Sequence, residues 1–188
     1  MKINNLQITS ATTLNFDFTS TAPICVLRGR YSDLALDLMR ELIGDYGAQN
    51  DPDRVDDGRF VIHADIEMDN KDYSVCYIRN ADFMGDNRLA VNFKTNSIQF
   101  SEDDTREFVT KCSERDTGDT NVLIKTADIS YCEDDRPIFI SDYFDRLDEA
   151  IDITPVLDEL ASLGRQVFIS VCAGYPEIKH EKVQMVQV

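Results

Sequence analysis

The feature that most constrains the fold is a short apolar run at residues 138–140, which follows a proline and precedes an acid, Asp142. Comparable apolar runs occur at residues 24–28 and 167–171. Short, continuously apolar segments are typical of strands buried on both faces of a parallel sheet. We therefore expect an α/β fold that delivers Asp142 to the carboxyl edge of the sheet, where ligands of open α/β sheets bind.

Composition favours one compact domain. The chain has 188 residues and 43% of them are hydrophobic, which argues against disorder. A single domain over residues 1–188 is expected. The formal net charge of −16 means that most of the surface repels a phosphate backbone, so no direct nucleic-acid partner is expected.

The cysteines and the apolar segments indicate where the chain resides. The five cysteines form no C-x-x-C pair and most lie in apolar runs, which indicates reduced, mostly buried thiols. No segment reaches the roughly 18 apolar residues of a membrane helix, and the first residues lack the apolar region of a signal peptide. A cytoplasmic protein without a membrane partner is expected.

Further strands and helices are expected before, between and after the three apolar runs. Alternating segments predict strands at residues 2–18 (two antiparallel strands), 60–68, 73–79, 89–93 and 182–188, the last as an edge strand. Helical spacing predicts helices at residues 33–43, 104–111, 122–131 and 154–163. A polar loop is expected at residues 48–58, and Thr154 with Pro155 is expected to open the last helix as its N-cap and first residue.

Five segments resemble, in the same order, the motifs of ABC-type ATPase heads of the RecF and SMC kind. The best preserved is the stretch from 136 to 149, which resembles a Walker B strand and D-loop, with an acid at Asp142 and a Leu-Asp pair at Leu147 and Asp148. Ser141 stands where that family has the Mg²⁺-binding Asp. Asp142 matches the catalytic acid and is the candidate catalytic residue.

The strand, turn and helix from residue 24 to residue 43 resemble the skeleton of a P-loop, G-x-x-x-x-G-K-[ST]. Gly29 matches the first glycine, but Leu34, Ala35 and Leu36 replace the second glycine, the lysine and the hydroxyl residue. A charge-assisted contact is worth roughly 1.5–3 kcal/mol, so the missing lysine alone weakens triphosphate binding by about one to two orders of magnitude.

Few groups remain at this turn that could bind an anion. Arg28 and Arg30 flank Gly29, and Ser32 follows. With Gly29 and the D-loop-like Asp148 they form the nucleotide-binding candidates, although Asp33 would repel a phosphate. An ordinary strand-to-helix turn with solvated arginines is the alternative interpretation.

Two further motifs are degenerate. The segment 116–120 resembles the family signature, with Thr117 and Gly118 in place of Ser and Gly, but its acids would face a phosphate. An N-capping turn is the alternative interpretation of this segment. Cys172 stands at the switch histidine, and a thiol does not orient water as imidazole does.

The resemblance implies a P-loop NTPase-like fold, the ABC ATPase head, with a central, mostly parallel sheet, an antiparallel meander and no coiled-coil insertion. It implies a non-catalytic pseudo-ATPase without a cofactor, an interaction or regulatory module that pairs with itself or with an active ATPase head. The alternative is a weak or unorthodox ATP-binding or hydrolysing protein that uses ATP and Mg²⁺, with Asp142 acting beside Arg28 or Arg30. A third possibility is a nucleotide or anion sensor without turnover.

Overall fold

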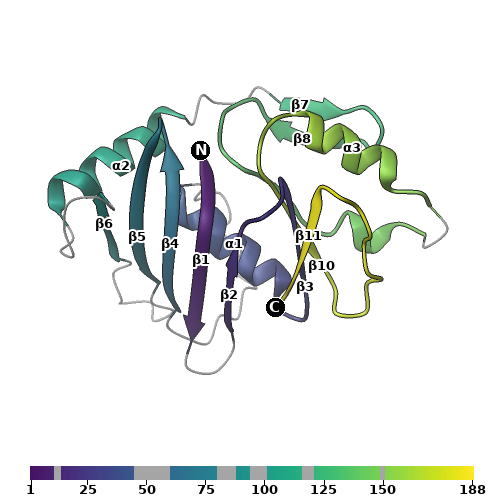
Figure 1. The fold of residues 1–188 in the computed structure, drawn as a ribbon, viewed down its shortest axis with the longest axis horizontal. Helices are drawn as coiled ribbons and strands as arrows, with labels where there is room; N and C mark the ends of the chain where they lie inside the picture. The colour runs from purple at the N-terminus through teal and green to yellow at the C-terminus, as the bar shows by residue number, and fades with distance from the viewer. Residues whose placement is uncertain (11–13, 45–59, 80–87, 94–100, 116–120, 149–150) are drawn as a thin grey trace. The chain divides into compact units, whose positions relative to one another are not determined.

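A computed structural model of the protein describes residues 1–10, 14–44, 60–79, 88–93, 101–115, 121–148 and 151–188 (Figure 1). These residues form two compact units. Unit 1 comprises Met1–Lys2, Ser20–Leu36 and Arg115–Val188, and unit 2 comprises Ile3–Thr19 and Asp37–Glu114. A single domain over residues 1–188 stays a prediction, and the polar loop expected at 48–58 lies outside the described residues.

Unit 1 is built on a four-stranded sheet in the order β11-β3-β10-β9, in which every pair of neighbours is parallel. Its strands are β3 (Ile24–Arg28), β9 (Ile138–Ile140), β10 (Val167–Val171) and β11 (Val183–Gln187). The prediction that three apolar runs share one layer is confirmed, because β10 pairs with β3 on one side and β9 on the other. Every residue of β10 is buried, as expected for a strand covered on both faces. The edge position of β11 is also confirmed.

Helix α3 (Thr154–Ser162) packs against this sheet through Val156, Leu157 and Leu160. The prediction of a helix opened by Pro155 is confirmed, but Thr154 is not its N-cap. The N-cap residue is Ile153, whose side chain makes no capping bond, and the Asp152 carboxylate accepts a hydrogen bond from the Thr154 N–H at 3.0 Å instead.

The helix predicted at residues 122–131 is wrong. This segment is a hairpin of β7 (Asn121–Ile124) and β8 (Ile129–Cys132), joined by a turn in which Asp128 has φ 56°. Its β-branched residues favour strands. Ile124, Ala127 and Ile129, around the turn, are the buried residues of the hairpin in the core of unit 1, and Tyr131 packs against them only partly buried, so the apparent helical spacing is a coincidence.

A carboxylate from α3 holds the hairpin turn in place. Glu159 accepts hydrogen bonds from the Lys125 N–H at 3.0 Å, the Thr126 N–H at 3.2 Å and the Thr126 hydroxyl at 2.6 Å. These bonds hold the pKa of Glu159 below its usual range, and the bond from the Thr126 hydroxyl contributes most. Because the partner of the turn lies about 30 residues away in the sequence, local patterns could not reveal it.

Unit 2 contains a five-stranded sheet in the order β2-β1-β4-β5-β6. Its strands are β1 (Lys2–Ser10), β2 (Asn15–Thr19), β4 (Phe60–Met68), β5 (Lys71–Arg79) and β6 (Arg88–Phe93). The predicted antiparallel pair and meander are confirmed. Asp69 and Asn70 join β4 to β5 with φ 54° and 59°, the left-handed conformation that two-residue hairpin loops require.

Two helices complete the described part of unit 2. Helix α1 (Ser32–Leu42) begins in unit 1 and continues into unit 2, where the buried Glu41 carboxylate accepts a hydrogen bond from the Tyr77 hydroxyl and pairs with Arg79 at 3.4 Å. Helix α2 (Glu102–Glu114) is longer than predicted and packs Phe108 against Tyr73, with ring centroids 5.4 Å apart. The helices of the described residues form no coiled coil, and none of them is long and apolar enough to cross a membrane.

Candidate functional site

The carboxyl edge of the parallel sheet brings together most of the predicted site residues. Three chain segments leave the sheet there: the turn after β3, the loop after β9 and the segment after β10. They carry Gly29, Asp142 and Cys172, as the sequence pattern predicted. Thr117 and Gly118 lie outside the described residues, and the chain that follows them enters strand β7 rather than a helix.

The P-loop-like turn is filled by the chain itself. Only Gly29, Arg30 and Tyr31 separate β3 from α1. The buried Ser32 hydroxyl lies 3.1 Å from the Gly29 carbonyl oxygen and 2.9 Å from the Val171 carbonyl oxygen, to which it donates. The Gly29 N–H also donates to the Val171 carbonyl, at 3.1 Å. A backbone N–H and a hydroxyl, groups of the kind that bind phosphate in a P-loop, are thus bonded to carbonyls of the protein.

Gly29 is required by a close approach of two backbones. A Cβ at this position would lie 1.7 Å from the carbonyl oxygen of Val188. Val188 is held there by its N–H, which donates to the Arg28 carbonyl at 2.9 Å. The glycine that resembles the first P-loop glycine therefore has a structural explanation that involves no ligand.

The charged side chains at this turn are engaged locally. The Arg28 Nε donates to the Ala173 carbonyl at 3.2 Å, and the Arg30 guanidinium lies 5.4 Å from the centre of the Tyr31 ring. The Asp33 carboxylate accepts a hydrogen bond from the Ser170 hydroxyl. Since Asp33 lies in the first turn of α1, its negative charge occupies the helix N-terminus where a P-loop binds phosphate.

Asp142 lies at the end of β9 in an open position. Its φ of 57° is in the left-handed region, which aspartate tolerates better than most residues. Its side chain is 60% exposed and faces the Arg146 guanidinium at 3.5 Å. A solvent-exposed pair of this kind contributes about 0–1 kcal/mol, so it does little to orient the carboxylate.

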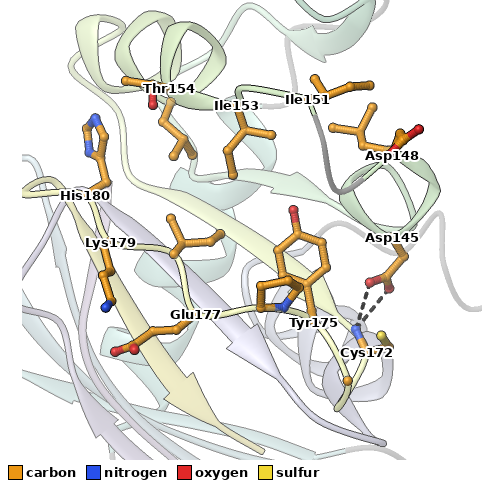
Figure 2. Close-up of a pocket in the computed structure, with 15 residues that line it drawn as sticks. Asp145, Asp148, Ile151, Ile153, Thr154, Cys172, Tyr175, Glu177, Lys179 and His180 are labelled. Carbon is orange, nitrogen blue, oxygen red and sulfur yellow. Dashed lines mark hydrogen bonds between the residues drawn. The ribbon is translucent and has the colours of Figure 1, made fainter.

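The D-loop-like segment contains a short 3₁₀ helix, η2 (Phe144–Arg146), anchored by the fully buried Phe144. The next residue, Asp145, accepts the Cys172 N–H with both carboxylate oxygens at 3.0 Å (Figure 2). This contact joins the loop after β9 to the segment after β10. Asp145 was not a predicted site residue, and its only sequence signal was its place in the D-loop-like stretch.

A cavity of about 380 Å³ lies next to this contact (Figure 2). It is bounded by the chain after η2, by the start of α3 and by the segment that follows β10. Its lining residues are Asp145, Leu147, Asp148, Ile151, Ile153, Thr154, Leu157, Cys172, Gly174, Tyr175, Pro176, Glu177, Ile178, Lys179 and His180. Of the predicted nucleotide-binding residues that the structure describes, only Asp148 lines this cavity. Residues 174–180 form much of its wall, although no motif marks them in the sequence.

Burial and charge both act on the titratable groups here. Partial burial of Tyr175 raises the pKa of its hydroxyl, and the neighbouring Asp145 and Cys172 add to the effect.

Cys25, a buried thiol of β3, has its pKa raised to about 11 by desolvation, so it is inert at neutral pH. The five cysteines are free, and Cys132 and Cys172 are exposed, so the prediction of mostly buried thiols holds only in part.

Metal chemistry finds little support in the described residues. They contain no group of three His, Cys, Asp or Glu side chains arranged to hold an ion. Ser141, which precedes the candidate acid Asp142, is exposed at the end of β9.

Comparison with known proteins adds no assignment. The sequence matches no protein-family model, and no curated protein matches it. The class that the fold defines is an α/β protein with a parallel four-stranded sheet and a separate antiparallel sheet.

Proposed function

We propose that this protein is a non-catalytic, RecF/SMC-like member of the ABC ATPase-head class that acts as an interaction or regulatory module. The order of parts in unit 1 supports the class, since a strand, glycine turn and helix share a sheet with a strand that ends at an acid. The observation that carries the loss of catalysis is the filled turn, in which Ser32 and Gly29 bond to Val171 while Val188 lies against Gly29.

The turn is also too short for the phosphate loop. A P-loop places four residues between its two glycines so that backbone N–H groups surround the phosphates. Here α1 already begins at Ser32, and its first turn carries Asp33 rather than a lysine. A triphosphate would meet a carboxylate and lack the cation that neutralises it, so binding is expected to be negligible at millimolar ATP.

The catalytic alternative requires Asp142 to act with Arg28 or Arg30. Asp142 pairs with Arg146 instead, and Arg28 donates to a backbone carbonyl. This geometry favours the non-catalytic proposal over the alternative.

The partner that we propose is another protein, either a second copy or an active ATPase head. The net charge of −16 supports a protein partner over nucleic acid. We place the protein in the cytoplasm because its five cysteines are free thiols. No bound nucleotide or metal is part of the proposal.

The test is the melting temperature of the full chain in millimolar Mg-ATP. A ligand present at 100 times its Kd stabilises by about 2.7 kcal/mol, which for a chain of this size is a rise of roughly 5–11 °C. We expect no rise and no phosphate release.

A rise without turnover would instead support the nucleotide-sensor function. Steady phosphate release that Asp142→Asn abolishes would establish the catalytic alternative. The matched control is Asp17→Asn, which alters an exposed carboxylate of unit 2.

A further inference from the structure

Apolar side chains form part of the lining of the cavity beside η2, together with polar groups. Leu157, which lines it, is 1% exposed, and Ile153, Ile178 and the Tyr175 ring are partly buried against the core of unit 1. Ile151 also lines it and is 50% exposed, which makes it one of the exposed large apolar side chains of the described residues. The volume of about 380 Å³ falls at the lower end of the roughly 300–1,000 Å³ typical of binding pockets.

Two carboxylates lie at one end of this cavity, and the carboxylate of Glu177 lies apart from them (Figure 2). Asp145 and Asp148 lie there, next to Ile151, and both are exposed (Figure 2). Although Asp145 accepts the Cys172 N–H, a carboxylate has further acceptor positions.

The cations at the other end are turned away or already paired. Figure 2 shows the Lys179 ammonium directed away from the cavity. His180 Nε2 lies 3.4 Å from the Asp158 carboxylate, and Lys182 Nζ lies 3.8 Å from the same oxygen. The cavity therefore combines several apolar side chains with an acidic end.

We propose that this cavity is the docking site for a segment of a partner protein in which an arginine or lysine stands next to a large apolar residue. The inference rests on the proposed interaction function and specifies the chemistry of the partner. The apolar side chain enters between Tyr175 and Ile153, and the cation lies against Asp145 and Asp148. A net charge of −16 steers basic segments toward the protein. The half-exposed Ile151 extends the apolar contact beyond the cavity, which suits a peptide better than an enclosed small molecule.

The test measures binding of fluorescent synthetic peptides to the full chain by fluorescence anisotropy. One set carries Leu or Phe between arginines, and the matched set carries glutamate in place of arginine. We expect only the basic set to bind, and its affinity to fall as salt rises. Ile151→Ala should weaken binding at least about fivefold, as truncation of an interface anchor commonly does. The control is Leu123→Ala on β7, whose side chain is also 50% exposed, and it should leave the affinity unchanged.

A second variant tests the acidic end. Asp148→Asn should weaken binding of the basic peptides, whereas Glu133→Gln, which alters an exposed carboxylate outside the cavity lining, should not. Melting curves of each variant show that it is folded. Equal binding of the two peptide sets, or equal effects of Ile151→Ala and Leu123→Ala, overturns the proposal.

The peptide-binding test and the Mg-ATP test can fail independently of each other. If no peptide binds and Mg-ATP leaves the melting temperature unchanged, the docking proposal is wrong and the pseudo-ATPase proposal stands. If Mg-ATP stabilises the protein, the pseudo-ATPase proposal fails whatever the peptides do.

Discussion

The buried carboxylate of Asp134 offers a strong test of how unit 1 is held together. Its side chain is 4% exposed and accepts bonds from the Arg136 guanidinium at 2.7 and 2.9 Å and from Arg165 at 3.1 Å. Arg165 also donates to the carbonyls of Cys132 and Arg136 and lies over the Tyr131 ring. Together these contacts hold the segment between β8 and β9 against the residues that precede β10.

Asp134→Ala leaves two partly buried guanidinium groups without their shared anion. Removal of one partner of a buried ion pair costs about 3–5 kcal/mol. Arg165 keeps its two carbonyl acceptors, so we expect a loss near the lower limit, about 3 kcal/mol of unfolding free energy. This corresponds to a fall of about 6–12 °C in Tm for a chain of this size.

The assay is urea denaturation of the full chain, supported by calorimetry. The control is Asp103→Ala, which removes a 91% exposed carboxylate that pairs with the 74% exposed Arg106. A surface pair is worth about 0–1 kcal/mol, so Asp103→Ala should cost at most about 1 kcal/mol. If the two variants lose the same unfolding free energy, the buried cluster around Asp134 does not contribute more to the stability of unit 1 than a surface ion pair, and the reasoning is refuted.

Two further predictions concern stability. Gly29→Ala should cost about 1–3 kcal/mol of unfolding free energy, the usual effect of overpacking, because its Cβ meets the Val188 carbonyl. The control in the same denaturation assay is Gly174→Ala, which should be nearly neutral because no atom lies within 4 Å of its Cβ. Equal losses of stability in the two variants would contradict the prediction. The folded state lowers the pKa of Glu159, so its stabilisation is present above the unfolded pKa of about 4.3 and is lost as pH falls through the folded pKa. The difference in Tm between wild type and Glu159→Gln should therefore shrink from pH 6 to pH 3, and a constant difference would count against this role.

The sequence was sufficient to predict the parallel sheet of unit 1. Its three apolar runs, at residues 24–28, 138–140 and 167–171, are mostly buried, and such runs are visible without knowledge of their partners. The antiparallel strands of unit 2 were predicted for the complementary reason that their burial alternates along the chain, as β4 shows.

The features that escaped prediction depend on partners distant in sequence. Glu159 stabilises a hairpin turn around Thr126 that the local pattern assigned to a helix. The bond between Asp145 and Cys172 and the role of Val188 beside Gly29 likewise join separate segments. Periodicity detects which face of a segment is buried, but it does not show which polar group reaches that segment from elsewhere.

The bond from Ser32 to Val171 spans 139 residues of the chain, and the one from Gln166 to Ser20 spans 146. Contacts so remote in sequence carry a large loop-closure entropy, and folding rates fall as such contacts become dominant. During synthesis, β3 emerges long before β10 and β11, so its apolar surface has no native neighbours in the sheet until most of the chain has been translated. Unit 1 is thus expected to form late, and the nascent chain to depend on protection from aggregation until it does.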